Sequence, residues 1–179
     1  MTVEHLRAHG DVYARDGLLD FAVNVRRGRP PGLVQALEEA LEDERYPDQR
    51  PAREALAALH GVEPENVLLL NGACEGFWLL AQAIRPRRAT VFYPTFSEGE
   101  LALRAVGSKV ERVALTSPDW ALPSACDASG FVVVTNPNNP TARLERVESV
   151  EQLAGRERLL VVDESFMDFA CDRETLAHR

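Results

Sequence analysis

Phe131-Val132-Val133-Val134-Thr135-Asn136-Pro137-Asn138-Asn139-Pro140-Thr141 is the stretch that decides the fold: an apolar run that ends in a turn rich in amides. A second stretch, Leu159-Leu160-Val161-Val162-Asp163, repeats this arrangement and ends in a carboxylate. Continuous apolar runs, as opposed to alternating ones, are typical of parallel strands that are covered on both faces. The two stretches therefore predict two strands of a parallel β-sheet.

On either side of these stretches, short apolar runs alternate with amphipathic segments. The runs at residues 67–70, 90–93 and 110–115 predict further strands. The intervening segments predict helices at residues 77–84, 99–106 and 147–154. Such alternation favours right-handed crossovers and a parallel sheet. We therefore predict an α/β fold over residues 61–179, as a three-layer sandwich with a mostly parallel sheet.

The first 60 residues show a different pattern. Residues 18–23 form a short apolar patch, which predicts a strand within an N-terminal arm. Apolar positions at helical spacing predict helices at residues 33–41 and 53–60, and the second of these ends at Gly61. We expect residues 1–60 to form this arm and the helices of a small domain, separate from the sandwich.

Composition restricts the function. The 179 residues carry a formal net charge of −8, which argues against a nucleic-acid or anionic-membrane partner. No apolar run has the length of a membrane span, no signal-peptide pattern is present, and three widely spaced cysteines form neither a disulfide framework nor a metal knuckle. These features predict a cytoplasmic protein. Lys109 is the only lysine, so a mechanism that needs a lysine must use this one or borrow one from elsewhere.

Four predicted strands end on residues that can hold a ligand, and in an open parallel sheet ligands bind at the carboxyl ends of the strands. These ends offer a glycine turn into a helix at Gly72, an aromatic ring at Phe96, an amide at Asn139 and a carboxylate at Asp163. Taken singly, a turn glycine, a core phenylalanine and an Asn-Pro turn are ordinary features. Their shared position favours a ligand site.

Asp163 is the most informative of the four, because a carboxylate that ends a buried strand is costly without a partner. A magnesium-binding acid of a nucleotide hydrolase would fit the apolar run before it, but the chain lacks the glycine-rich loop with Gly-Lys-Ser/Thr that such enzymes need. The four histidines are scattered and do not favour zinc. No Gly-x-Ser-x-Gly turn predicts a serine hydrolase.

A phosphorylated pyridine such as pyridoxal phosphate (PLP) would use all four strand ends. The carboxylate of Asp163 would keep the ring nitrogen protonated, and Phe96 would stack on the ring. The amide of Asn139 would donate to the phenolic oxygen. The phosphate would bind backbone N–H groups at a helix start, where the helix dipole favours anions, namely those of Gly72, Ala73 and Cys74.

The order of the motifs resembles that of fold-type I aminotransferases. Asn-Gly-Ala-Cys-Glu-Gly (71–76), Tyr-Pro-Thr-Phe (93–96), Asn-Pro-Asn-Asn-Pro-Thr (136–141) and Val-Val-Asp-Glu-Ser-Phe-Met-Asp-Phe (161–169) follow the family's order. The sequence is most similar to the branch of histidinol-phosphate aminotransferase and of threonine-phosphate decarboxylase, an enzyme of cobalamin synthesis. The resemblance implies a PLP-dependent enzyme that acts on a phosphorylated amino acid or amino alcohol. It matches five residues to the roles given above: Ala73, Cys74, Phe96, Asn139 and Asp163.

Further positions depend on the resemblance alone. Tyr46 matches a tyrosine that reaches the cofactor phosphate of the other subunit, which implies a homodimer. His9 and Asn24 lie in an arm that looks like the substrate-binding arm of the decarboxylase. Phe166 stands where aminotransferases usually carry tyrosine and where phenylalanine is common in the decarboxylase-like group. We therefore favour a decarboxylase-like function, with an aminotransferase as the alternative.

The resemblance also predicts what these 179 residues lack. In this family the Schiff-base lysine follows the strand after the one that ends at Asp163, and Lys109 does not match it. The arginine that binds the substrate carboxylate and two strands of the sheet would also lie further on. We expect the chain to be the N-terminal part of such an enzyme and to be inactive alone. A non-catalytic fragment, or a split subunit completed by a partner chain, is the alternative from another class.

Overall fold

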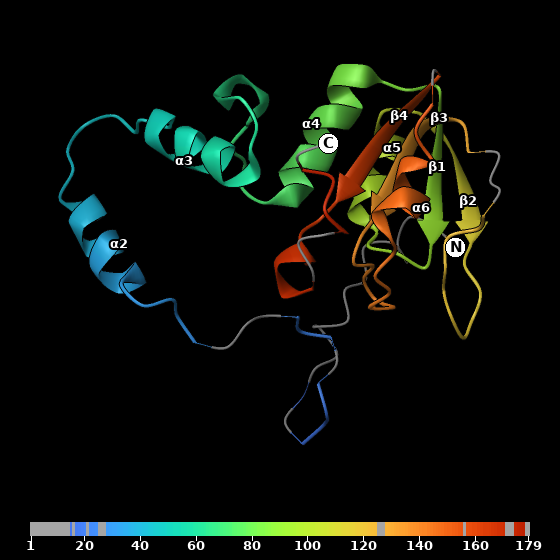
Figure 1. Ribbon diagram of the computed structural model, residues 1–179, viewed down its shortest axis with the longest axis horizontal. Helices are drawn as coiled ribbons and strands as arrows, with labels where there is room; N and C mark the ends of the chain where they lie inside the picture. The colour runs from blue at the N-terminus through green and yellow to red at the C-terminus, as the bar shows by residue number, and fades with distance from the viewer. Residues whose placement is uncertain are drawn as a thin grey trace.

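The computed structural model describes residues 15, 17–20, 22–24, 28–124, 128–155, 157–170 and 174–177. Its centre is a four-stranded sheet with the strand order β2-β1-β3-β4 (Figure 1). Every neighbouring pair is parallel. The strands lie close to four of the predicted runs, which confirms an α/β fold with a parallel sheet: β1 (Arg88–Tyr93), β2 (Lys109–Ala114), β3 (Gly130–Thr135) and β4 (Arg158–Asp163).

Helices cover both faces of the sheet, because successive side chains of a strand point to opposite faces. On one face, Phe131 and Val133 of β3 belong to a buried cluster with residues of α4 (Ala73–Ile84) and α5 (Glu98–Ala105). The intervening valines of β3 belong to a second cluster with α6 (Val147–Glu151) on the other face. Figure 1 shows α5 and α6 on opposite sides of the sheet. The predicted three-layer sandwich is confirmed.

Two helices precede the sandwich and lie apart from it in Figure 1. The first, α2 (Leu33–Leu41), has the predicted bounds and buries none of its residues. The second, α3 (Arg50–His60), begins three residues before the predicted start, since Pro51 is tolerated in a first helical turn. It ends at Gly61, whose φ of 64° suits a residue without a side chain. None of the described helices is both long and apolar enough to cross a membrane.

Two predicted strands are absent from the described residues. After the short η2 turn (Pro64–Asn66), Val67 is extended, but residues 67–70 pair with no described strand and Leu68 is 71% exposed. Residues 17–20 and 22–24 contain no strand either, and Leu19 is 86% exposed. The reason is the same in both segments. An apolar run favours extended backbone, but a strand also needs the N–H and C=O groups of a neighbour.

The last described segment packs back against the sandwich. β4 is followed by η3 (Met167–Phe169), and residues 174–177 then return toward β4 and α6. The side chain of Glu164 accepts hydrogen bonds from the Thr175 hydroxyl and from the N–H of Leu176, the latter at 2.7 Å. Glu164 therefore turns away from the end of β4 and fixes this segment, although its neighbour Asp163 stays at the edge of the sheet.

Candidate functional site

The carboxyl ends of β3 and β4 lie side by side, because Thr135 pairs with Asp163 in the parallel register. The N–H of Asn136 donates to the carbonyl of Asp163 at 2.9 Å, which extends the pairing one residue beyond β3. Strand β1 flanks β3 on its other side, so its end at Tyr93 opens onto the same edge. The predicted convergence of strand ends is confirmed for β1, β3 and β4.

Asp163 is buried, with only 8% of its surface exposed. Its Oδ1 accepts hydrogen bonds from the N–H of Ser165, at 3.0 Å, and from the Ser165 hydroxyl. Among the described residues, none donates to Oδ2, and no arginine, lysine or histidine pairs with the carboxylate. A largely buried carboxylate without a cationic partner is costly, and Oδ2 is open to a partner because it is not among the buried atoms that lack one. The site is therefore suited to a ligand that carries a positive N–H group.

The glycine turn leads into α4 with an open helix start. Gly72 has a φ of 89°, and a Cβ atom placed there would meet no atom within 4 Å. The carboxylate of Glu75 accepts hydrogen bonds from the N–H and side-chain amide of Asn71, at 2.6 and 3.0 Å, and so closes the turn. No side-chain cap occupies the first turn of α4. An anion can therefore approach the N–H groups at the start of this helix.

The first turn of α4 lies within electrostatic range of Asp163. Cys74 is exposed, and the pKa of its thiol is raised, first by partial desolvation and then by the negative charges of Glu98 and Asp163. The charge effect requires these carboxylates to lie near the thiol, because such interactions weaken with distance in water. The glycine turn and the end of β4 therefore belong to the same region of the molecule.

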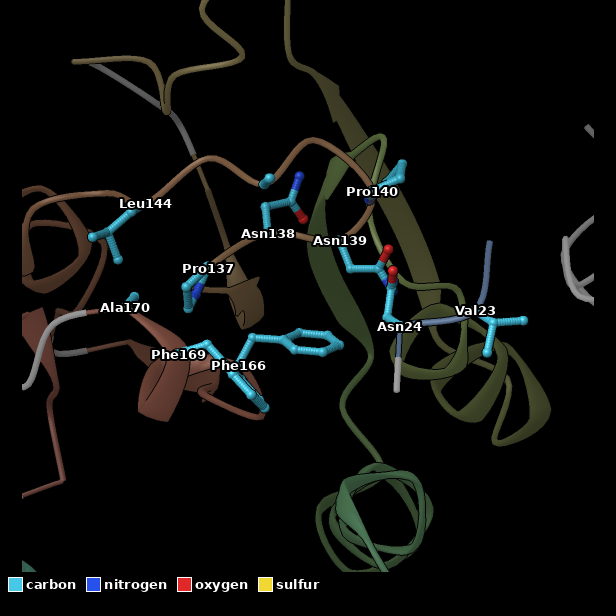
Figure 2. A pocket seen from close by; sticks show the side chains of 11 residues that line it. Val23, Asn24, Pro137, Asn138, Asn139, Pro140, Leu144, Phe166, Phe169 and Ala170 are labelled. Atoms are coloured by element: carbon cyan, nitrogen blue, oxygen red, sulfur yellow. The ribbon is translucent and has the colours of Figure 1, made fainter. Parts of the chain in front are cut away.

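A cavity of about 470 Å³ opens beside the asparagine-rich loop (Figure 2). Asn24, Asn139 and Phe166 line it from three separate parts of the chain, with Leu144 and Phe169 among its apolar lining. In Figure 2 the side chains of Asn24 and Asn139 point toward one another. The Asn139 side chain is half-buried, and the structure shows no described residue hydrogen-bonded to it. Its amide can therefore bind a ligand in the cavity.

The other predicted site residues lie outside this cavity lining. Phe96 is half-buried and packs against the cluster formed by α4, α5 and the sheet, so it has a structural role in addition to any stacking role. Tyr46 is 98% exposed in the loop between α2 and α3. His9 lies outside the described residues. Asn24 and Asn139 thus line the same cavity, and Asp163 lies in the same region as residues 72–74. The lining of that cavity does not include Asp163 or residues 72–74.

Lys109 lies at the opposite edge of the sheet. It begins β2, is exposed, and pairs with the first residue of β1. Strands rise about 3.3 Å per residue, so the six residues of β2 place it about 17 Å from the edge that holds Asp163. This lysine cannot reach a ligand bound at the carboxyl ends of the strands.

Sequence reasoning missed two residues of this edge, Asn138 and Thr95. Asn138 is 9% exposed and hydrogen-bonded on both sides of its amide, and Thr95 is one of its partners. Both lie in the quoted motifs, directly before Asn139 and Phe96. The sequence could not tell which of two adjacent asparagines faces a cavity and which is buried. No cluster of metal-ligating side chains occurs within the part of the chain that the structure describes.

Comparison with known proteins places these observations in a family. The sequence model of class I and II aminotransferases matches residues 16–179. A histidinol-phosphate aminotransferase of Mycobacterium tuberculosis is 44% identical over 170 residues, covering 91% of this chain and 46% of that protein. The threonine-phosphate decarboxylase of Salmonella typhimurium is 34% identical over 169 residues, covering 86% of this chain and 46% of that protein.

Solved structures agree on the fold. The crystal structure of the histidinol-phosphate aminotransferase from Clostridium acetobutylicum superposes with a TM-score of 0.75 at 22% identity, covering 89% of this chain and 51% of that one. At this identity the likeness concerns the fold alone. The chain spans about half the length of the curated relatives it matches, 46% for both proteins named above.

Proposed function

Because the chain belongs to the family of class I and II aminotransferases, we propose that it holds PLP at the carboxyl edge of the sheet. Members of the family depend on this cofactor. PLP supplies an electron sink for carbanion chemistry next to the amino group of a substrate. The protein is then a PLP-dependent enzyme acting on a phosphorylated amine, and its residues 1–179 supply part of the cofactor site.

The state of Asp163 carries this proposal. A protonated pyridine nitrogen is a cation with one N–H. It matches a largely buried carboxylate that, among the described residues, has no cationic partner and no donor to Oδ2. In return, the carboxylate favours the protonated ring, because an opposite charge at contact distance raises the pKa of a base. Asp163 would thereby keep the ring in the form that withdraws electrons best.

Other residues fit the remaining groups of the cofactor. The start of α4 offers Gly72, Ala73 and Cys74 to the phosphate, at a turn without a side-chain cap. The side chain of Asn139 is available to donate to the phenolic oxygen. Phe96 is half-buried beside the same edge, where it would stack on the ring.

The choice of reaction rests on two opposing observations. Relatives of 44% identity are histidinol-phosphate aminotransferases and the threonine-phosphate decarboxylase is 34% identical, which favours an aminotransferase acting on a phosphorylated amino alcohol. This reverses the preference drawn from the sequence alone. Phe166 favours the second candidate, a phosphoamino acid decarboxylase, because it lines the same cavity as Asn139 without offering a hydroxyl.

Two proposals concern substrate and assembly. Asn24 lines the cavity opposite Asn139, so we assign it, with His9, to substrate binding. Tyr46 is 98% exposed in the loop between α2 and α3, two helices that lie apart from the sandwich in Figure 1. A tyrosine in this position can serve a cofactor phosphate only in a second subunit, which supports a homodimer.

Binding of PLP and of pyridoxal, which lacks the phosphate, tests the site. An alanine at position 72 would be strained at the positive φ that Gly72 adopts, so the Gly72→Ala substitution should shift the start of α4. We expect PLP to bind about tenfold more weakly, and pyridoxal, which has no phosphate, to bind almost unchanged. Gly107→Ala is the matched control, since Gly107 has a φ of 83°, an equally open Cβ position and a place before β2 at the far edge. Equal effects of both substitutions on PLP would contradict the phosphate assignment.

The reaction is tested on a complete enzyme that contains residues 1–179, supplied as one polypeptide or with a partner chain. One assay offers histidinol phosphate and 2-oxoglutarate and measures glutamate. The other offers threonine phosphate and measures carbon dioxide. Formation of glutamate without carbon dioxide supports the aminotransferase, and the opposite result supports the decarboxylase.

A further inference from the structure

Asn138 uses its whole side-chain amide to join the turn after β1 to its own loop after β3. Its Oδ1 accepts a hydrogen bond from the hydroxyl of Thr95 at 2.9 Å. Its Nδ2 donates to the carbonyl of Pro94 at 2.9 Å and to the hydroxyl of Thr141 at 2.8 Å. Both amide hydrogens are therefore in use. Asn138 has little left to offer a ligand, although the cavity reaches its side chain.

The backbone of Asn138 completes the loop around it. Its N–H donates to the carbonyl of Arg143, and its carbonyl accepts from the N–H of Ala142, both at 2.8 Å. The Thr95 hydroxyl also lies 3.2 Å from that of Thr135 at the end of β3. The turn after β1 and the turn after β3 are thus joined by one continuous network.

The two residues that follow this network are the ones assigned to the cofactor ring. Thr95 precedes Phe96, and Asn138 precedes Asn139. In contrast to its neighbour, the Asn139 side chain has no hydrogen bond to any described residue and faces the cavity. A side chain on a loop keeps a fixed direction only if the adjacent backbone is held. The network supplies that hold for both residues at once.

We propose that Asn138, through Thr95, is a positioning residue that fixes the amide of Asn139 and the ring of Phe96 relative to one another, an inference that rests on the proposed PLP site. Asn138 touches neither the cofactor nor the substrate in this role. It sets the direction from which Asn139 donates to the phenolic oxygen. Loss of the network would leave that donor misplaced even while PLP remains bound.

The bound cofactor reports on this donor directly. A hydrogen bond to the ionised phenolic oxygen favours that form and lowers its pKa. The absorption of PLP bound to the protein is therefore titrated with pH, in the wild type and in four variants. Asn139→Ala removes the donor and serves as the reference. Asn138→Ala and Thr95→Val break the network from its two sides. Thr95→Ser keeps the hydroxyl and is the matched control.

We expect Asn138→Ala and Thr95→Val to raise the pKa of bound PLP toward that of Asn139→Ala, by about one unit, because a misplaced hydrogen bond to a charged group costs about 1.4 kcal/mol. Thr95→Ser should titrate like the wild type. A role in stability alone would reduce the amount of folded protein and of bound PLP without moving the titration of the bound fraction. If Asn138→Ala does not fold, Thr95→Val makes the same test.

The possible failures are distinct. If Asn139→Ala moves the titration but Asn138→Ala and Thr95→Val titrate like the wild type, the positioning role is wrong and the cofactor site stands. If the wild type binds no PLP, or if Asn139→Ala leaves the titration unchanged, the proposed site fails and the inference falls with it.

Discussion

The Asp163→Asn substitution tests whether the carboxylate of Asp163 binds the cofactor or only stabilises the fold. The amide keeps the size of the side chain and an oxygen for Ser165, but it removes the charge from a residue that is 8% exposed and lacks a described cationic partner. A hydrogen bond to a charged group contributes about 1.5–3 kcal/mol. We therefore expect PLP affinity to fall about 10- to 150-fold, at tenfold for each 1.4 kcal/mol. Without PLP, the free energy of unfolding should rise or stay within about 1 kcal/mol, since an unpaired buried charge is removed.

Equilibrium dialysis measures PLP affinity, and urea unfolding without PLP measures stability. Asp168→Asn is the control, because Asp168 is exposed on η3 five positions away and faces none of the proposed site. It should change neither quantity. Unchanged PLP affinity in Asp163→Asn, together with a stability loss of about 3 kcal/mol, would refute the reasoning and assign Asp163 a purely structural role.

Three further predictions follow from other parts of the chain. Addition of PLP to residues 1–179 and reduction with borohydride should give no specifically labelled peptide, because Lys109 begins β2 at the far edge of the sheet; stoichiometric labelling of Lys109 would contradict this. The pKa of Cys74 is raised by desolvation and by two carboxylates, so its alkylation should reach half-maximal rate above the pH of an ordinary thiol. Asp163→Asn should lower that midpoint, as mass spectrometry of the Cys74 peptide can follow. Glu100→Gln should lower the free energy of unfolding in urea by about 1.5–3 kcal/mol, because the buried carboxylate bonds Arg104 at 2.6 Å and Arg112 at 2.8 Å; it should leave PLP affinity of the folded protein unchanged.

Strands could be predicted where the apolar pattern of the segment itself indicates that it is buried. Continuous apolar runs identified β3 and β4, since a strand covered on both faces must be apolar at every position. The rule fits β3, whereas β4 lies at the edge of the described sheet and its Leu159 is 45% exposed. The same rule failed at residues 67–70, which are equally apolar but pair with no described strand. Pairing depends on what lies beside a segment in space. That information is not in the segment itself, and the exposure of Leu68 is its consequence.

The site was predictable to the level of strand ends and no further. Parallel strands bring their carboxyl ends together, so Asp163 and the asparagine-rich turn could be placed at one edge from the sequence. The sequence could not predict that Asn138 is hydrogen-bonded within the chain and that Asn139 faces the cavity. This difference depends on which of the two amides contacts Thr95 and Pro94 in the turn after β1. The packing of Phe96 against the core could not be predicted either, since it depends on contacts with the cluster that α4 and α5 form with the sheet.

The hydrogen bonds at this edge of the sheet leave two polar groups open to a ligand. Two of the three asparagines at this edge are buried and hydrogen-bonded within the chain. Asn136 exchanges hydrogen bonds with the backbone of Glu145, and Asn138 accepts one from the hydroxyl of Thr95. Asn139 and Oδ2 of Asp163 are the exceptions among these groups. Both groups keep contact with solvent: Asn139 is half-buried, and among the described residues Nη2 of Arg112 is the one buried side-chain nitrogen or oxygen without a partner. A ligand that offers an acceptor to Asn139 and a cationic N–H to Asp163 would fill both open positions. It would stabilise the folded chain by RT ln(1 + L/Kd), where L is the free ligand concentration.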